Sequence, residues 1–303
     1  MVDLLYKDGV IPSPEDKRDW KIAREMDLPC GASLDKMIPR TFRIKWLPKV
    51  KDQGGVSSCT AHALSLAYSC LIHAKIGADV DYSIIWLYGN RRESAYRGKG
   101  AIMRDAVKTA AKYGDVEYID LPGNIEMLEA MYRFDENFDK MKGLSEKLID
   151  GYVRLETEEE AKAWMVKYPE VPIIASVMTN DVYGMNVTTG RHCMALIGWI
   201  GDKALFQNSW GKYYKYPEIE FNKINEMWGL IPMAKEEKKT FKDVQPERWS
   251  ADAISEATQD GIIEGFPDGT FAPEKAPTRE QIAVIWQRMK RYMESHFEVK
   301  NDV

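Results

Sequence analysis

The sequence lacks the features that mark membrane, exported and nucleic-acid-binding proteins. No stretch approaches the roughly 20 consecutive apolar residues of a membrane-spanning helix, and the N-terminus, MVDLLYKDGVIPSPEDKRDW, lacks the apolar core of a secretory signal. The formal net charge is −5, so there is no excess of basic charge to attract phosphate backbones. We therefore expect no membrane span, no Sec export of the chain as given and no nucleic-acid partner.

Cysteine and histidine are scarce, with four of each among 303 residues. The spacings between Cys30, Cys59, Cys70 and Cys193 fit neither a zinc knuckle nor a disulfide framework. We therefore expect no metal site and no cofactor. Cys30, Cys70 and Cys193 are interpreted as small buried apolar side chains, whereas Cys59 has a different neighbourhood.

The composition is typical of a globular protein, with 45% apolar and 29% charged residues, and the length suits a medium-sized domain and a small one. Residues 1–38 are rich in proline and charge without a sustained period, and we interpret them as an irregular strap. Residues 39–233 have a globular pattern, and the charged run 234–240 is the predicted linker. Residues 241–295 form a small C-terminal module.

Within the larger domain, helical patterns come early and strand patterns come late, which favours an α+β fold of two lobes over an alternating parallel sheet. The helical segments place apolar residues at helical spacings, and the strand segments are β-branched or aromatic runs with short polar breaks. Helices are predicted at residues 57–74, 103–114 and 157–168, and strands at residues 171–178, 193–200 and 203–210.

Cys59 is the candidate nucleophile. It lies in the first turn of the helix predicted from SSCTAHALSLAYSCLIHA, with Ser57 or Ser58 available as N-cap. A thiol attacks as thiolate, and a helix N-terminus together with a nearby imidazolium lowers its pKa. The sequence therefore predicts a reactive thiol at this position.

The base for that thiol must be one of four histidines. His62 and His73 lie on the helix of Cys59 itself, where the geometry for a lateral contact is poor, and His296 belongs to the charged C-terminal tail. His192 opens a predicted strand, and Asn208 lies on the next one, so the two can sit side by side across a hairpin. An amide oxygen there can accept the imidazole proton and fix the tautomer. We therefore expect His192 as base.

Acyl transfer also needs hydrogen-bond donors directed at the developing oxyanion. Gln53 lies six positions before Cys59, in the glycine-bearing loop QGGVSS that leads to the helix. Its side-chain amide and the backbone N–H of Cys59 could together form the oxyanion hole. Singly, each of these residues has a structural explanation, but their order and local contexts favour a catalytic one.

Three motifs in one order carry a family resemblance. VKDQGGVSSCTAHA resembles the nucleophile segment of papain-like cysteine peptidases, RHCMALIGW their histidine strand, and FQNSWGKYY their asparagine and tryptophan segment. These motifs span residues 50–214, and PSPEDKRDW is similar to the N-terminal strap of a bacterial branch of the family. The resemblance implies a papain-like fold with a helical lobe and an antiparallel β lobe.

The resemblance also assigns roles by position. It implies Gln53 as oxyanion donor, Cys59 as nucleophile, His192 as base and Asn208 as its orienting partner. Trp210 would shield the hydrogen bond between His192 and Asn208. Gly100 would pair with substrate backbone, and Met103 lies in the segment GAIMRDAVKTAAKYG, which resembles the family's substrate groove.

Several residues depart from the family pattern. Val56 replaces a cysteine that many relatives pair in a disulfide, and Arg191 stands before the histidine where relatives often have glycine or aspartate. Arg191 is therefore expected to alter substrate access or subsite preference. After NSWG, the sequence KYYKYP lacks the usual second tryptophan and glycine. If residues 1–38 leave the groove open, the enzyme should be active as made.

The C-terminal module resembles one S-layer homology (SLH) module through FKDV, GIIEGFPDGTFAP and TREQIAVIWQR. It is expected to hold two helices around a turn, with Thr278 and Gln281 forming a capping box. One apolar face of the second helix is predicted from Ile282, Ile285, Trp286 and Met289.

The resemblance implies a site for a secondary cell-wall polysaccharide in this module. The candidate residues are Trp249, Gly265, Asp268, Thr270 and Arg279. Arg279 at a helix N-terminus offers a forked cation beside free N–H groups, which suits a carboxylate. Family sites usually need three modules, so we expect either weak binding or a homotrimer.

Three functions are compatible with these residues. The first is a cysteine endopeptidase tethered to a bacterial wall polymer, the second is a catalytically inactive binding or structural protein such as a phage or surface component, and the third is acyl transfer on the same thiol. Localisation stays open between a phage product released by lysis, a virion part, a cytoplasmic protein and a chain whose start lies upstream.

Overall fold

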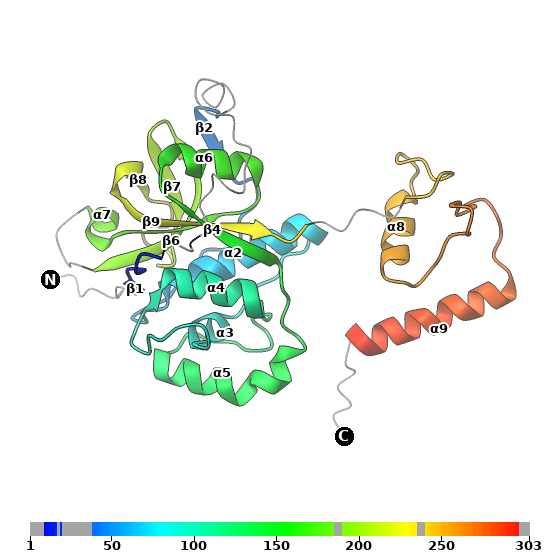
Figure 1. Cartoon of the computed structure of the whole chain (residues 1–303), viewed down its shortest axis with the longest axis horizontal. Helices are drawn as coiled ribbons and strands as arrows, with labels where there is room; N and C mark the ends of the chain where they lie inside the picture. The colour runs from blue at the N-terminus through cyan, green and yellow to red at the C-terminus, as the bar shows by residue number, and fades with distance from the viewer. Residues whose placement is uncertain (1–8, 17–18, 20–37, 185–189, 235–239, 297–303) are drawn as a thin grey trace. The chain divides into compact units, whose positions relative to one another are not determined.

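The computed structural model describes residues 9–16, 19, 38–184, 190–234 and 240–296. The chain divides into two compact units, Met1–Ala234 and Lys235–Val303, whose elements are labelled in Figure 1. Most of the predicted linker, residues 235–239, lies outside the described residues, as does Cys30. Within the described ranges, no helix combines the length and the apolar character that crossing a bilayer requires.

Four helices form one side of the first unit. They are α2 (Cys59–Ile76), α3 (Ile84–Gly89), α4 (Met103–Tyr113) and α5 (Met127–Lys142). Helix α2 begins after the predicted N-cap Ser58 and ends at Gly77, whose φ of 72° suits a glycine. Its residues from Cys59 to Ile72 are all buried, which explains why it has no polar face. Helix α4 ends at the predicted Gly114.

An antiparallel sheet forms the other side. Among the described residues it contains seven strands, in the order β4-β9-β5-β6-β7-β8 with β2 also paired to β6. The strands are β2 (Thr41–Arg43), β4 (Ile149–Leu155), β5 (Ile173–Met178), β6 (Arg191–Ile200), β7 (Lys203–Gln207), β8 (Glu218–Glu220) and β9 (Ile224–Pro232). The short helices α6 (Glu158–Lys167), α7 (Thr179–Tyr183) and η2 (Phe221–Lys223) belong to this lobe.

The two lobes meet where α2 packs against β6. In Figure 1, α3, α4 and α5 lie together on one side of the sheet, and α2 runs along it. Strands β5 and β6 are almost wholly buried, as a strand covered on both faces must be. The expected α+β fold, with a helical lobe and an antiparallel β lobe, is thus confirmed.

A second, two-stranded sheet involves the N-terminal segment. Strand β1 (Val10–Ile11) pairs in parallel with β3 (Ala101–Ile102), which directly precedes α4. Val10 is buried. The described part of the predicted strap is therefore packed on the domain.

The second unit contains α8 (Ala251–Gln259) and α9 (Arg279–His296). Thr278 accepts from the Gln281 backbone N–H at 3.1 Å and donates its own N–H to the Gln281 side chain at 2.8 Å, so the capping box is present. The predicted apolar face of α9 is not buried within the unit, because Ile282 is 54% and Trp286 62% exposed.

Candidate active site

Cys59 is the first residue of α2. The first turn of this helix carries no acidic residue, so no carboxylate there opposes a thiolate near the positive end of the helix dipole. The side chain is fully buried, with 0% exposure. The helix therefore presents a thiol at the junction between the lobes, where β6 packs against α2.

His192 and Asn208 are joined by a short hydrogen bond. The pairing of β6 with β7 sets Ala195 opposite Gln207, so the residue after Gln207 falls near the start of β6. Nε2 of His192 and Oδ1 of Asn208 are 2.7 Å apart. The same Oδ1 accepts the Ser209 backbone N–H at 2.7 Å, which fixes the orientation of the amide. An amide oxygen only accepts, so Nε2 carries the proton.

Trp210 covers this pair. Its ring lies 4.4 Å from the His192 ring, at 30° to it, and its side chain is fully buried. Tyr183 of α7 stacks on Trp210 at 4.8 Å. A hydrogen bond in such a dry environment is stronger than the same bond in water.

Gln53 is held by its neighbours. Its Nε2 donates to the Val56 carbonyl at 2.9 Å, and its Oε1 accepts the Ser209 hydroxyl at 2.6 Å. Since an amide nitrogen carries two hydrogens, the Val56 bond uses one of them. The Asn124 side chain donates to the Gln53 carbonyl at 2.7 Å, so the loop before α2 is tied down on both sides.

His62 is excluded as the base by its surroundings. Its Nδ1 lies 3.0 Å from the Ser58 carbonyl, one turn back along the same helix. Burial lowers the pKa of His62 to about 3. The imidazole is therefore neutral at ordinary pH and serves the core, as the sequence indicated.

Gly9 of the strap lies directly over the thiol. A Cβ built on Gly9 would stand 2.7 Å from Sγ of Cys59. The Gly9 N–H donates to the Arg191 carbonyl at 3.2 Å, and its carbonyl accepts the Ala101 N–H at 2.7 Å. Because Arg191 directly precedes His192, the same glycine lies between the helix that carries the thiol and the strand that carries the imidazole.

The strap is anchored beyond Gly9. The Ser13 N–H donates to the carboxylate of Glu226 at 3.2 Å, and the Ser13 hydroxyl accepts the Arg104 N–H at 3.0 Å. The Arg104 guanidinium donates to the Pro14 carbonyl at 2.9 Å and to Asp19 at 3.4 Å. The described part of the strap is therefore held in place by Arg104 of α4 and Glu226 of β9.

Two of the residues expected in the substrate groove lie beside the strap. Gly100 has a φ of 85°, and a Cβ on it would stand 2.4 Å from the Gly9 carbonyl oxygen, so only glycine fits there. Met103 is fully buried at the start of α4. The backbone that the sequence assigned to substrate is occupied by the chain's own segment.

The remaining described cysteines, Cys70 and Cys193, are buried and form no disulfide. Burial raises the pKa of both thiols. Both are therefore held as unreactive thiols, in agreement with their interpretation as apolar side chains. In the parts of the chain that the structure covers, no cluster of three or more His, Cys, Asp or Glu could hold a metal ion.

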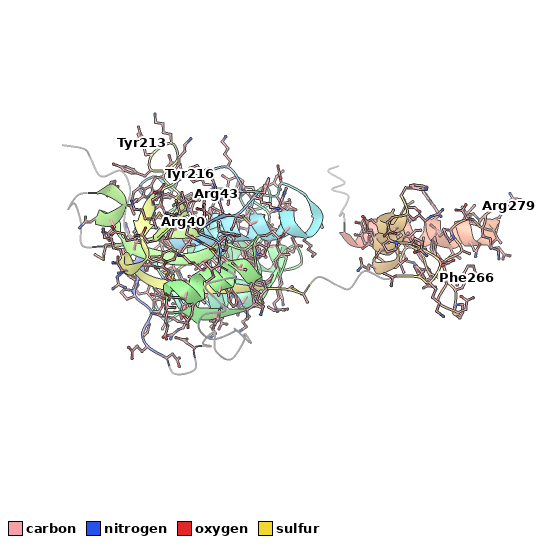
Figure 2. All side chains as sticks on the ribbon, turned by 90° about the horizontal axis from the view of Figure 1, so that it is seen from above. Arg40, Arg43, Tyr213, Tyr216, Phe266 and Arg279 are labelled. Carbon is pink, nitrogen blue, oxygen red and sulfur yellow. The ribbon has the colours of Figure 1, made fainter. Side chains whose placement is uncertain are left out.

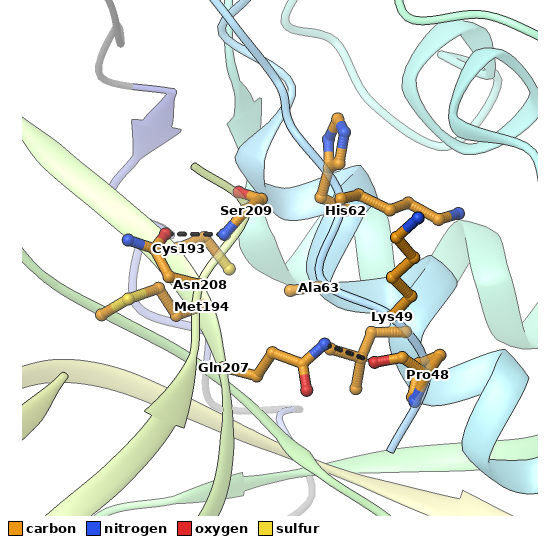
Figure 3. Close-up of a pocket in the computed structure, with 11 residues that line it drawn as sticks. Pro48, Lys49, His62, Ala63, Cys193, Met194, Gln207, Asn208 and Ser209 are labelled. Carbon is orange, nitrogen blue, oxygen red and sulfur yellow. Dashed lines mark hydrogen bonds between the residues drawn. The ribbon is translucent and has the colours of Figure 1, made fainter. Parts of the chain in front are cut away.

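A small cavity lies behind the candidate site (Figure 3). Its volume is about 20 Å³, and its walls include His62, Cys193, Gln207 and Asn208. Such a volume has room for one water molecule. The Gln207 amide lines it while donating to the Pro48 carbonyl at 3.0 Å. This space is too small for a peptide.

In the C-terminal unit, Asp268 and Thr270 share one turn. Oδ1 of Asp268 accepts the Thr270 N–H at 3.0 Å and the Thr270 hydroxyl at 2.6 Å, and these bonds lower the pKa of Asp268. Trp249 is 91% exposed, and Arg279 begins α9 on the surface. Asp268 therefore has a structural role in the turn. Trp249, in contrast, is not part of the hydrophobic core.

Gly265 has a packing role. A Cβ on it would stand 2.0 Å from the Phe241 ring, so a side chain is excluded. Asp243, which the sequence did not single out, accepts the Phe271 and Ala272 N–H groups at 2.8 and 2.7 Å. This aspartate therefore fixes the backbone that directly follows Thr270.

The sequence missed the residues that hold the strap. No sequence pattern marks Gly9, Arg104 or Glu226 as strap contacts. The strap itself has no hydrophobic periodicity from which its position could be predicted. Glu226 looks like any polar residue of a strand, although it is buried. Only the three-dimensional pairing of β1 with β3 brings Gly9 to Cys59.

Comparison with known proteins identifies the C-terminal unit. Residues 240–283 match the S-layer homology domain. The cellulosome-anchoring protein of Acetivibrio thermocellus is 44% identical over 46 residues, 15% of this chain and 10% of that protein. The outer membrane protein SlpA of Thermus thermophilus is 35% identical over 60 residues, 20% of this chain and 6% of that protein. The chain thus spans a tenth or less of these relatives.

Solved structures match the larger unit. Xylellain, a cysteine protease from Xylella fastidiosa, has a TM-score of 0.61 at 19% identity, and the match covers 77% of this chain and 100% of that chain. Digestive procathepsin L2 from Tenebrio molitor larval midgut has a TM-score of 0.55 at 19% identity, over 76% of this chain and 78% of that chain. The chain therefore joins a domain with the papain-like cysteine protease fold to an S-layer homology domain.

Proposed function

We propose that this protein is a cysteine endopeptidase that hydrolyses peptide bonds with Cys59, His192 and Asn208 and is targeted to a bacterial wall polymer by its S-layer homology domain. The observation that carries the proposal is the 2.7 Å bond between His192 Nε2 and Asn208 Oδ1. That bond leaves Nδ1 as the imidazole nitrogen for exchange of a proton with the thiol.

The proposed reaction has two stages. The Cys59 thiol gives its proton to His192, and the thiolate attacks the carbonyl carbon of the peptide bond. The Gln53 amide and the Cys59 N–H stabilise the oxyanion, and His192 then protonates the leaving amine. Water, deprotonated by His192, hydrolyses the thioester and regenerates the thiol. Asn208 holds the imidazole in the tautomer that both stages need.

The strap makes the resting protein latent in this proposal. With Gly9 against Sγ, and with both Cys59 and His192 at 0% exposure, a substrate carbonyl cannot reach the thiol. Hydrolysis therefore requires the strap to leave the groove. We expect slow activity in the full chain, at a rate set by opening of the strap.

Labelling with an epoxysuccinyl probe tests the catalytic assignment. The full chain should gain one adduct per molecule, on Cys59, and cleave casein. Cys59→Ala should gain none, while the matched variant Cys70→Ala should behave as the parent. An adduct on Cys59→Ala would overturn the assignment. Complete labelling of Cys59 in a protein that cleaves no peptide would instead favour an inactive binding protein, and mass analysis of products separates acyl transfer from hydrolysis.

Binding to wall sacculi tests the targeting. Arg279 begins α9, where its guanidinium and the helix N-terminus suit an anionic group of the polymer. We expect purified Gram-positive sacculi to retain the parent and to lose Arg279→Ala. Arg291→Ala, which removes an exposed arginine farther along the same helix, is the matched control. Equal retention of both variants would contradict the assignment, and the mass of the bound species in solution tests the homotrimer.

A further inference from the structure

The loop after Trp210 is unusually exposed. Residues 212–216, of sequence KYYKY, are all on the surface, and Tyr213, Tyr214 and Tyr216 are 42–46% exposed. Three solvent-facing tyrosines interspersed with two lysines contribute little to a core. Contiguous exposed aromatic surface on a soluble domain is typical of a binding site.

Two further cations adjoin this loop. The Arg43 guanidinium lies 4.9 Å from the centre of the Tyr216 ring, and Arg43, Lys45 and Tyr216 line one open hollow together with Ile44 and Leu47. Figure 2 shows Tyr213, Tyr216 and Arg43 on the same side of the domain. The loop and the end of β2 therefore form one continuous surface.

Within the described ranges, the cations of this surface have no carboxylate partner. Counting only carboxylates in the described ranges, none lies within 4.0 Å of Arg43, Lys45, Lys212 or Lys215. The chain as a whole has a net charge of −5, so a local cluster of cations has the opposite sign to the chain's overall charge. A local positive field of this kind attracts acidic partners and speeds their association.

The loop is also strained. Tyr214 has a φ of 44°, which is rare and unfavourable for a bulky residue. The Asn208 N–H donates to the Lys215 carbonyl at 2.9 Å, so the strained backbone is tied to the candidate triad. Backbone strain of this kind clusters at functional sites.

An aromatic chain connects the loop to the imidazole. Tyr214 meets the edge of Trp210 with ring centres 6.0 Å apart, and Trp210 lies 4.4 Å from His192. Tyr214 also contacts Tyr183 at 5.4 Å. Only the Trp210 ring therefore separates the exposed Tyr214 from His192. A polypeptide bound to this loop would lie next to a peptide bond held at His192.

We infer that the loop after Trp210 and the end of β2 form a substrate-binding surface that selects acidic polypeptide segments next to the scissile bond. This surface, here named the basic tyrosine surface, consists of Lys212, Tyr213, Lys215, Tyr216, Arg43 and Lys45. The inference rests on the proposed function, because it assigns the substrate class of that site. Tyrosines offer rigid contact area at small entropic cost, and the cations supply the preference for Glu and Asp.

A binding measurement tests the inference without turnover. Full-length Cys59→Ala is titrated against two labelled peptides of equal length, one rich in Glu and one rich in Lys, at low salt, with fluorescence anisotropy as the readout. We expect the Glu peptide to bind and the Lys peptide not to bind. Adding Lys212→Glu and Lys215→Glu should weaken the Glu peptide by about tenfold or more.

The matched control reverses two charges elsewhere. Lys140 of α5 and Lys147, in the segment before β4, are exposed, and Lys140→Glu with Lys147→Glu should leave binding unchanged. Equal loss in both double variants, or equal binding of the two peptides, would overturn the inference. Tighter binding of polygalacturonate than of the Glu peptide at the same surface would also overturn it, in favour of a glycan. Failure of Cys59 labelling would contradict the peptidase proposal alone, since this titration needs no thiol.

Discussion

Gly9 fits against Cys59 so closely that any side chain on it would collide with the thiol. A Cβ on Gly9 would stand 2.7 Å from Sγ and 2.7 Å from the Ser57 carbonyl oxygen. Contact below 3.0 Å forces something to move, and the Ser57 carbonyl belongs to the backbone that enters α2. The position of the strap therefore depends on the absence of a side chain at residue 9.

Substitution of this glycine should open the groove. Overpacking of a tight contact costs about 1–3 kcal/mol, and displacement of the strap relieves it. We expect Gly9→Ala to raise the rate of Cys59 labelling by the epoxysuccinyl probe by about tenfold, equivalent to about 1.4 kcal/mol. Gly143→Ala is the control, because a Cβ at Gly143 meets nothing within 4 Å. An unchanged rate in Gly9→Ala would show that the strap does not limit access.

Loss of the Arg104 contacts should act in the same direction. The guanidinium bonds to the Pro14 carbonyl and to Asp19, and hydrogen bonds to charged groups contribute about 1.5–3 kcal/mol when they are shielded from water. We expect Arg104→Met, which keeps the aliphatic stem, to speed Cys59 labelling several-fold. Arg133→Met, at an exposed arginine of α5, should not. Slower labelling in Arg104→Met would contradict the assigned anchoring role.

The elements that the sequence predicted correctly share a strong local pattern. Helix α2 and strands β5, β6 and β7 are long or apolar enough for their periodicity to be read directly. The hydrogen bond between His192 and Asn208 followed from two adjacent strands. Local pattern and chain order therefore sufficed for the central part of the candidate site.

The rest depends on contacts between distant segments. Strand β1 has two residues and gains its partner 91 positions away, as Val10 pairs with Ala101. Helix α5 buries only four of its residues among many charges, which obscures its period. In the C-terminal unit, Trp286 belongs to a regular apolar face and is nevertheless exposed. Periodicity predicts a face but not the surface that covers it.

Asn208 should matter for catalysis more than for stability. Its Oδ1 fixes the His192 tautomer at 2.7 Å, and a base in the wrong tautomer loses several orders of magnitude of rate in comparable triads. We expect Asn208→Ala to lower casein turnover by about 100-fold or more and to slow Cys59 labelling as well, since the thiol would lose an oriented base. Asn137→Ala, at a half-buried asparagine of α5 whose amide donates to the Arg133 carbonyl of the same helix, is the control.

Thermal unfolding of the same two variants separates orientation from folding. If Asn208→Ala loses activity only in proportion to its unfolded fraction, the orienting role is contradicted. Retention of the parental pH dependence of labelling in Asn208→Ala would contradict it as well, because an imidazole without its partner should titrate differently.

His62 should make stability depend on pH. Burial lowers the pKa of the folded-state imidazole to about 3, while the unfolded chain titrates near the ordinary value of 6.5. Between these values the unfolded chain binds a proton that the folded protein does not. The free energy of unfolding therefore falls as the pH drops below 6.5, by about 1.4 kcal/mol per pH unit.

Urea unfolding at pH 7 and pH 5 measures this effect. The parent should lose about 2 kcal/mol of its free energy of unfolding from His62 between these pH values, and His62→Gln should lack that loss whatever its stability at pH 7. Buried Asp115, whose pKa burial raises well above its ordinary value, contributes with the opposite sign, but it is present in both proteins and cancels in the difference. Equal pH dependence in parent and variant would show that folding does not lower the pKa of His62, which would restore His62 as a competitor of His192.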